Sequence, residues 1–165
     1  MILGRGSYGT VLRAIYKKLN VAVKILKKSC STYKSLKQEA NILGLKQENV
    51  IEILKIVECN TYGAVVMERF EGSKSLQYVL DNHKVDLIHR LHILSDISAG
   101  LAFCHQNKIV HLDLKPQNVL VAIDDAKRNN DRLYICKLLD FGCSIKLDIE
   151  CDPYDHFAVS VSFEI

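Results

Sequence analysis

The sequence predicts an α+β fold, with a small β-rich part followed by a helical part. The first third of the chain alternates short apolar runs with turn signals, a pattern typical of strands. Beyond residue 73 the apolar residues recur every three to four positions, which is typical of amphipathic helix. The length of 165 residues is enough for about one domain with a sizeable core.

The β-rich part is expected to form a hairpin, three further strands and one helix. The hairpin comes first, and the strand after it is β-branched and apolar. The helix carries Leu36, Ala40 and Leu43 on one side. In chain order we predict the hairpin at Leu3 to Val11 and Ala14 to Tyr16, a strand at Val21 to Leu26, the helix at Ser35 to Leu45, and strands at Val50 to Val57 and Ala64 to Met67.

The helical part is expected to follow a hinge near Arg69 to Ser73, where Gly72 interrupts the pattern. A long amphipathic helix runs from Leu87 to about His105. A polar, charge-rich insertion is predicted at Ala122 to Arg132. Short strands are predicted on either side of it, at Ile109-Val110, Val119 to Val121 and Tyr134 to Leu139.

Composition and charge exclude several classes of protein. No apolar stretch of about 18 residues is present and no signal peptide is visible, so we expect no membrane span and a cytoplasmic protein. The net charge of only +3, without a basic stripe or an aromatic platform, argues against a nucleic-acid binder. The six cysteines form no C-x-x-C pair and no zinc spacing, so reduced thiols are expected.

Gly4-x-Gly6-x-x-Gly9-x-Val11 is a glycine-rich turn that could bring backbone N–H groups close to phosphates. A dinucleotide-binding fold has a related pattern, but there the glycines open a helix. Here Thr10 to Ala14 reads as strand, so the dinucleotide-binding alternative is rejected.

Lys24 lies in the strand Val-Ala-Val-Lys, where it could contact phosphates and pair with a glutamate of the following helix. Glu39 is the better candidate for that pair, because Leu43 follows it one turn later on an apolar face. Glu48 is the alternative, although it is expected to lie past the end of the helix.

The strongest signal is His-Leu-Asp-Leu-Lys-Pro-Gln-Asn at 111–118, followed by Asp-Phe-Gly at 140–142. Asp113 could accept the proton of an attacking hydroxyl, and Lys115 could neutralise charge on the transferred group. Asn118 and Asp140 are oxygen ligands of the kind that Mg²⁺ prefers. Because only five positions separate Asp113 from Asn118, one loop can present both to the same phosphate.

These motifs, in this order, resemble the eukaryotic protein kinase family, and Asp-Leu-Lys-Pro-x-Asn resembles its serine/threonine branch. Leu112 in place of the usual arginine, and Cys143-Ser144 after the Asp-Phe-Gly, narrow the resemblance to a kinase of germ cells. The resemblance covers about residues 1 to 147. It implies a bilobal fold and a cytoplasmic kinase that phosphorylates and activates a MAP kinase kinase during oocyte meiosis.

The resemblance also implies ATP and Mg²⁺ as cofactors and a set of site residues. Val11, Ala22 and Leu120 would sandwich the adenine, Met67 would be the gatekeeper, and the backbone of Glu68 and Phe70 would bind the adenine edge. The residues expected at the ATP site are Leu3, Gly4, Arg5, Gly6, Ser7, Tyr8, Gly9, Thr10, Val11, Ala22, Lys24, Glu39, Met67, Glu68, Phe70 and Leu120. The expected catalytic residues are Asp113 and Lys115, and the expected metal ligands are Asn118 and Asp140.

The sequence departs from the family after Leu147, where no Ala-Pro-Glu motif appears. We therefore predict a partial kinase domain over residues 1–165: a complete small β-rich lobe at 1–70, the start of a truncated helical large lobe at 71–147, and a divergent tail at 148–165. Leu112 removes the arginine that would hold a phosphorylated activation loop. The predicted function is transfer of the ATP γ-phosphoryl group to serine or threonine of a protein. The alternative is a catalytically inactive nucleotide-binding or regulatory fragment.

Overall fold

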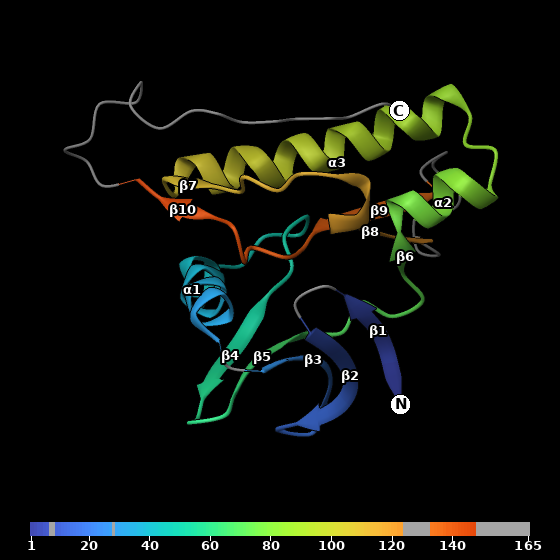
Figure 1. Cartoon of the computed structure of the whole chain (residues 1–165). Coiled ribbons are helices and arrows are strands. Elements are labelled where there is room, and N and C mark those ends of the chain that lie inside the picture. Colours follow the sequence, from blue (N-terminus) through green and yellow to red (C-terminus); the bar gives the residue numbers. More distant parts are fainter. Residues whose placement is uncertain (7–8, 28, 124–132, 148–165) are drawn as a thin grey trace.

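The computed structural model describes residues 1–6, 9–27, 29–123 and 133–147. These residues form a five-stranded sheet with a short helix beside it, and a second part that contains a long helix and two small sheets (Figure 1). The α+β class predicted from the sequence is therefore confirmed. The predicted tail at 148–165 lies outside the described residues, as does the predicted insertion except for Ala122 and Ile123.

The five-stranded sheet is antiparallel and has the order β1-β2-β3-β5-β4. Its strands are β1 (Ile2–Gly6), β2 (Gly9–Tyr16), β3 (Leu19–Lys27), β4 (Ile53–Glu58) and β5 (Tyr62–Glu68). The prediction that β4 begins at Val50 is wrong, because residues 49 to 51 pair with the second part of the molecule instead. The Ile51 N–H donates to the Leu138 carbonyl at 2.9 Å, and the Leu138 N–H donates to the Asn49 carbonyl at 2.8 Å.

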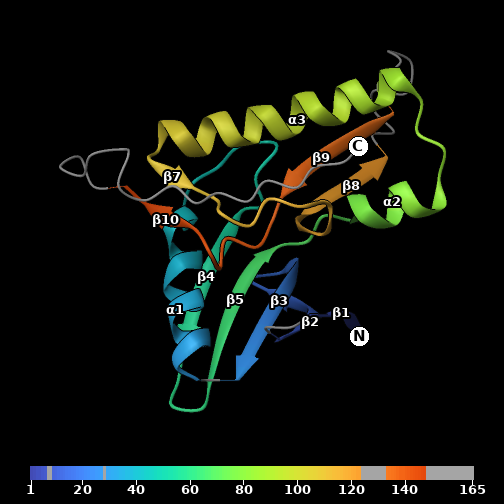
Figure 2. The same cartoon turned by 45° about the horizontal axis from the view of Figure 1, so that its top comes forward.

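Helix α1 (Cys30–Glu39) lies beside β4 and β5 (Figure 2). The sequence predicted it at Ser35 to Leu45, which is five residues late. Ser29 caps the N-terminus, where its side chain accepts a hydrogen bond from the Thr32 N–H and the Thr32 hydroxyl accepts one from the Ser29 N–H. The helix ends in one 3₁₀ turn, Ala40–Ile42, because Leu43 is extended and bridges to Ile53.

The second part is built around helix α3 (Leu87–Gln106), the long helix near the top of Figure 1. Its boundaries confirm the prediction, and Asp86 caps its N-terminus. A shorter helix, α2 (Leu76–Asn82), escaped prediction because it buries only Leu76 and Val79, too few for a periodic pattern. The strands form two small sheets, β6-β8-β9 and β7-β10, from β6 (Lys74–Ser75), β7 (Ile109–Val110), β8 (Val119–Ile123), β9 (Tyr134–Leu138) and β10 (Ile145–Lys146).

Helix α3 packs its buried side against β9. Ile93, Ile97 and Cys104 are buried there, and the buried Asp96 carboxylate accepts a hydrogen bond from the Cys136 N–H at 2.9 Å. The opposite side carries exposed leucines, with Leu87 at 71% and Leu91 at 55% exposure. In the described part of the chain, no helix combines the length and the apolar character needed to cross a bilayer.

Candidate active site

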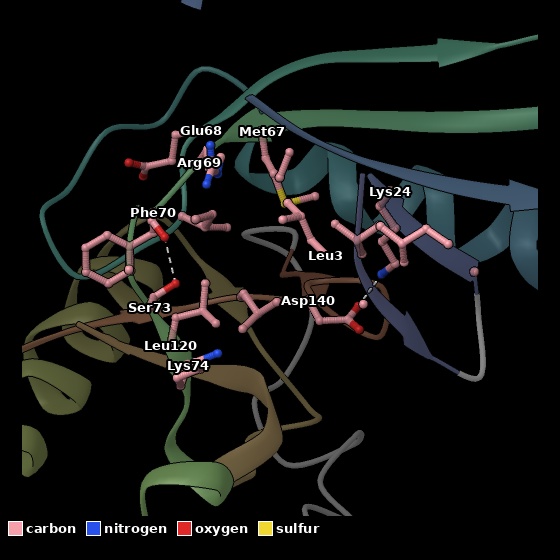
Figure 3. A pocket seen from close by; sticks show the side chains of 18 of the residues that line it. Leu3, Lys24, Met67, Glu68, Arg69, Phe70, Ser73, Lys74, Leu120 and Asp140 are labelled. Carbon is pink, nitrogen blue, oxygen red and sulfur yellow. Dashed lines mark hydrogen bonds and ion pairs between the residues drawn. The ribbon is translucent and has the colours of Figure 1, made fainter. Parts of the chain in front are cut away.

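A cavity of about 550 Å³ opens between the five-stranded sheet and the β6-β8-β9 sheet. Figure 3 shows Leu3 and Met67 on one side of it and Leu120 and Lys74 on the other, with Lys24 and Asp140 pointing toward each other at one end. A cavity of this size, with an apolar lining and a few charged groups toward either end, suits a small-molecule ligand.

Most of the predicted nucleotide-site residues line this cavity. They are Leu3, Gly4, Gly9, Val11, Ala22, Lys24, Glu39, Met67, Glu68, Phe70, Leu120 and Asp140. Thr10 does not, because neighbouring strand residues point to opposite faces and Val11 takes the face toward the cavity. Arg5 and Gly6 lie in β1, paired with Thr10 and Gly9, whereas Ser7 and Tyr8 lie outside the described residues.

Sequence reasoning missed several lining residues. Those of the connection after β5 follow directly from Met67 in the chain, so the predicted hinge could have pointed to them. Met1 and Ile2 directly precede the predicted Leu3 and pair with Arg13 and Leu12 in the same hairpin, so the predicted hairpin could have pointed to them as well. Ile51 is held by its pairing with the distant Leu138, which leaves no local signal. The missed residues are Met1, Ile2, Ile51, Arg69, Gly72, Ser73, Lys74 and Leu139.

The glycine-rich turn brings β2 close to β3. A side chain at Gly9 would collide with the backbone carbonyl of Ile25, so only glycine fits there. The same turn contributes Gly4 and Gly9 to the wall of the cavity.

Lys24 joins two acidic residues that are far apart in the sequence. Its Nζ lies 2.8 Å from Glu39 Oε1 and 2.6 Å from Asp140 Oδ1. Lys24 and Glu39 are buried, with exposures of 7% and 2%. Burial alone would lower the pKa of the Lys24 ammonium, but Glu39 and Asp140 outweigh it and the pKa is raised. Burial raises the pKa of the Glu39 carboxyl, and Lys24 opposes that rise.

The geometry therefore decides between the two glutamates that the sequence left open. Glu39 is the last residue of α1 and reaches Lys24, whereas Glu48 lies beyond the 3₁₀ turn that follows the helix.

The motif at residues 111–118 folds around the Asp113 side chain. Lys115 Nζ donates to both carboxylate oxygens of Asp113 at 2.8 Å, and Asn118 Nδ2 donates to Asp113 Oδ2 and to its carbonyl oxygen, each at 2.8 Å. The preceding residue, Leu112, adopts φ 61°, a left-handed conformation that is costly for a branched side chain. Such strain is concentrated at functional sites.

His111 connects this loop to the strand that leads to Asp140. Its Nδ1 accepts from the Asp113 N–H at 3.3 Å, so its Nε2 carries the proton and donates to the Leu139 carbonyl at 3.0 Å. Burial lowers the pKa of His111, which keeps the ring neutral. The ring lies 4.6 Å from that of Phe141, and Asp140 has φ 64°, a conformation that aspartate tolerates better than most residues.

The donor set near Asp113 fits Mg²⁺. Within residues 1–6, 9–27, 29–123 and 133–147, no cluster of three or more histidine, cysteine, aspartate or glutamate side chains could hold a metal ion. Mg²⁺ needs no such cluster, since it keeps several waters and uses one or two carboxylates together with substrate phosphates. The Asn118 amide nitrogen donates to Asp113, and Asp140 Oδ1 accepts from Lys24 Nζ. Asn118 Oδ1 and Asp140 Oδ2 take no part in those contacts.

Glu68, which lines the cavity, also joins two strands. Glu68 Oε1 accepts hydrogen bonds from Lys137 Nζ and the Glu52 N–H, each at 2.8 Å, and so connects β5 to β9.

Burial raises the pKa of the half-buried Cys143 thiol, and the nearby carboxylates of Asp113 and Asp140 raise it further. This environment disfavours a reactive thiolate at Cys143.

The sequence model of the protein kinase domain family matches residues 1–164, so the chain belongs to this family. The resemblance predicted from the motifs is thereby confirmed. The chain is 33% identical to the proto-oncogene serine/threonine-protein kinase mos of Rattus norvegicus, a match that covers 93% of this chain and 49% of the relative. The serine/threonine-protein kinase mos of Gallus gallus is 31% identical, with 88% of this chain and 46% of the relative covered.

The germ-cell kinase indicated by Leu112 and Cys143-Ser144 is also Mos, so this narrower resemblance agrees with the relatives. The chain spans about half the length of the curated relatives it matches.

Proposed function

We propose that this chain binds ATP in the cavity beside Lys24 and provides the catalytic residues of a serine/threonine protein kinase. The observation that carries the proposal is the contact of one buried ammonium, Lys24, with both Glu39 and Asp140. A strand, a helix and the Asp-Phe-Gly loop meet at this ammonium, at the end of the cavity where phosphates would lie.

In this proposal the side chains act by position and charge. Asp113 orients the substrate hydroxyl and accepts its proton, while Lys115, which already binds Asp113, turns to the transferred phosphoryl group. Lys24 holds the phosphates next to it. Asn118 and Asp140 would hold Mg²⁺, which when bound offsets the negative charge of the phosphates. Apolar Val11, Ala22 and Leu120 enclose the adenine, with Met67 behind it and the backbone of Glu68 and Phe70 at its edge.

The domain division follows the same proposal. Residues 1–70 would form the small lobe, residues 71–147 the start of the large lobe, and residues 148–165 a divergent tail. The cavity lies where the first two segments meet, which supports that boundary.

Nucleotide binding is tested by thermal melting of the 165-residue chain with and without Mg·ATP. A ligand that binds only the folded state raises the melting temperature. We expect a rise that disappears in Asp140→Asn, which removes the charge and tolerates the left-handed backbone at this position. Exposed Lys46→Ala is the matched control, since it removes a surface charge with the cavity intact. No rise in the unsubstituted chain would refute the proposal.

The similarity to Mos supports a finer proposal: a cytoplasmic kinase that activates a MAP kinase kinase during oocyte meiosis. In the complete gene product, Asp113→Asn should lower phosphorylation of a MAP kinase kinase on the order of 10²-fold or more. The substituted protein should still bind Mg·ATP, because Lys24 and Asp140 remain. Unchanged phosphorylation would remove the catalytic assignment and leave the alternative of an inactive nucleotide-binding fragment.

A further inference from the structure

A buried polar cluster joins the segment after Asp140 to helix α1. Ser144, at 0% exposure, is at its centre. Ser144 closes a turn in which its N–H donates to the Phe141 carbonyl at 3.0 Å, and Asn41, its main partner, lies 103 positions earlier in the chain. None of the motifs in the proposed function uses either residue.

The hydrogen bonds of the cluster fix the direction of the bond made by the Ser144 hydroxyl proton. The Ser144 hydroxyl has one proton, and it donates to the Gln38 carbonyl, which can only accept, at 3.0 Å. The hydroxyl oxygen must therefore accept from Asn41, and Asn41 Nδ2 donates to it at 2.9 Å. The same Nδ2 lies 3.3 Å from the Ser144 carbonyl oxygen. Gln38 near the end of α1 and Asn41 in the 3₁₀ turn after it thus both bind one serine.

Two contacts extend this joint toward the catalytic residues. The Phe141 N–H, one residue from Asp140, lies close enough to the Glu39 carboxylate to favour its charged form, which lowers the pKa of Glu39 against the effect of burial. A side chain at Gly142 would meet the Ser35 hydroxyl on α1, so the loop passes close to the helix at this point. The loop from Phe141 to Ser144 therefore contacts α1 at Ser35, Gln38 and Glu39, and the 3₁₀ turn after it at Asn41.

We propose that Ser144 and Asn41 are positioning residues that fix α1 against the Asp140 loop and thereby place Glu39 and Asp140 together on Lys24. The consequence for nucleotide binding rests on the proposed function, whereas the mechanical joint does not. Losing the buried Ser144 hydroxyl removes the hydrogen bond that Asn41 donates to it and the one that the Gln38 carbonyl accepts from it. Asn41 Nδ2 then keeps the 3.3 Å contact with the Ser144 carbonyl oxygen, and the Gln38 carbonyl keeps the Ala40 N–H.

Hydrogen exchange of the 165-residue chain without nucleotide tests the joint. In Ser144→Ala we expect amides of α1 and of residues 141–144 to exchange about fivefold faster, while those of α3 keep their rates. Ser75→Ala is the matched control, since Ser75 also loses a hydroxyl hydrogen bond, to the Tyr78 N–H, but at α2. Equal acceleration in α1 and α3, or none in α1, would overturn the proposal. Should Ser144→Ala not fold, Asn41→Ala carries the same test at a half-buried position.

A double-mutant cycle then connects the joint to the site. Ser144→Ala should weaken Mg·ATP binding about fivefold in the unsubstituted background and hardly at all in Glu39→Gln, because Ser144 acts on binding through the position of the Glu39 carboxylate. Fully additive losses would mean that Ser144 supports only general stability. An unsubstituted chain that binds no Mg·ATP would refute the proposed function, and the exchange pattern would still decide the joint.

Discussion

Helices α1 and α3 bury their inner sides by different means. In α1 the buried residues include Ser35, Leu36 and Glu39, two of which are polar. In α3 the buried side is mostly apolar, with Ile93, Ile97 and Cys104 around a single carboxylate, Asp96. Helix α3 is also twice as long, with 20 residues against 10.

The difference indicates that α3 mainly contributes to the stability of the fold, whereas α1 mainly fixes distances at Lys24. Apolar burial is strong but has no direction, so the apolar side chains of α3 support the fold without fixing any one atom, whereas Asp96 adds one directed contact, with the Cys136 N–H. Hydrogen bonds and ion pairs contribute less net free energy but define distances. Helix α1 holds Glu39 within 2.8 Å of Lys24 through such contacts, and we expect changes in α1 to alter ligand binding more than changes in α3 do.

The largest expected effect would come from breaking the charged contact of α1. Lys24→Met leaves the buried Glu39 carboxylate without its partner, so we expect the free energy of unfolding to fall by about 3–5 kcal/mol in urea denaturation. Lys24→Met/Glu39→Leu should recover much of that stability while Mg·ATP binding stays absent. A double variant that binds Mg·ATP would show that the ion pair does not define the site.

A substitution in the buried side of α3 should lower the free energy of unfolding without changing the affinity for Mg·ATP. Ile93→Ala removes a side chain that is 2% exposed, and we expect a loss of about 2–5 kcal/mol in the free energy of unfolding. Leu91→Ala, on the exposed side of the same helix, should cost no more than about 0.5 kcal/mol. Under conditions where Ile93→Ala remains folded, its affinity for Mg·ATP should equal that of the unsubstituted chain. A changed affinity would contradict the separation of the two helices.

The N-caps offer a balanced comparison, because each helix has one. Ser29→Ala and Asp86→Ala should each cost about 1 kcal/mol, since each removes a side chain that accepts a hydrogen bond from the first turn. Mg·ATP titration should separate them: Ser29→Ala loosens the helix that carries Glu39 and weakens binding, whereas Asp86→Ala leaves binding unchanged. Equal affinities in the two variants would remove the special role of α1.

The smallest expected effect concerns pH. Burial lowers the pKa of His111 below its usual 6.5, so between pH 6.5 and that lower value the unfolded chain binds more protons than the folded chain. The stability associated with neutral His111 is fully present above pH 6.5 and falls as the pH drops through this window. Urea denaturation at several pH values should therefore give a steeper loss for the unsubstituted chain than for His111→Asn, and parallel profiles would contradict the assignment.

Local patterns were enough to predict most of the fold and the charged side chains that meet at one end of the cavity. Strand periodicity located β2, β3 and β5, and spacing put Asp113 and Asn118 on one loop. The start of α1 was missed because the capping residue Ser29 has Thr32 at the third helical position, where a glutamate would have been the clearer signal. The predicted end failed because Leu43, although in helical register, pairs with Ile53 instead.

What the sequence could not reveal depends on pairing between distant segments. The Asn41–Ser144 hydrogen bond and the Glu68–Lys137 ion pair each join residues with no motif to connect them, at separations of 103 and 69 positions. Which side chains of a strand face the cavity also depends on register, which is why Val11 lines it and Thr10 does not.

The cysteines differ in burial, so the rates at which their thiols react can report how often the buried packing around them opens. Of Cys59, Cys104, Cys136 and Cys143, the exposed Cys59 should react first with a thiol reagent. Cys104, on the buried side of α3, has a pKa raised to about 11 by burial, so at pH 8 it is both covered and protonated. Cys136 in β9 is covered as well. The rate at which Cys104 and Cys136 become labelled would report how often the packing around α3 and β9 opens, without any probe attached to the cavity beside Lys24.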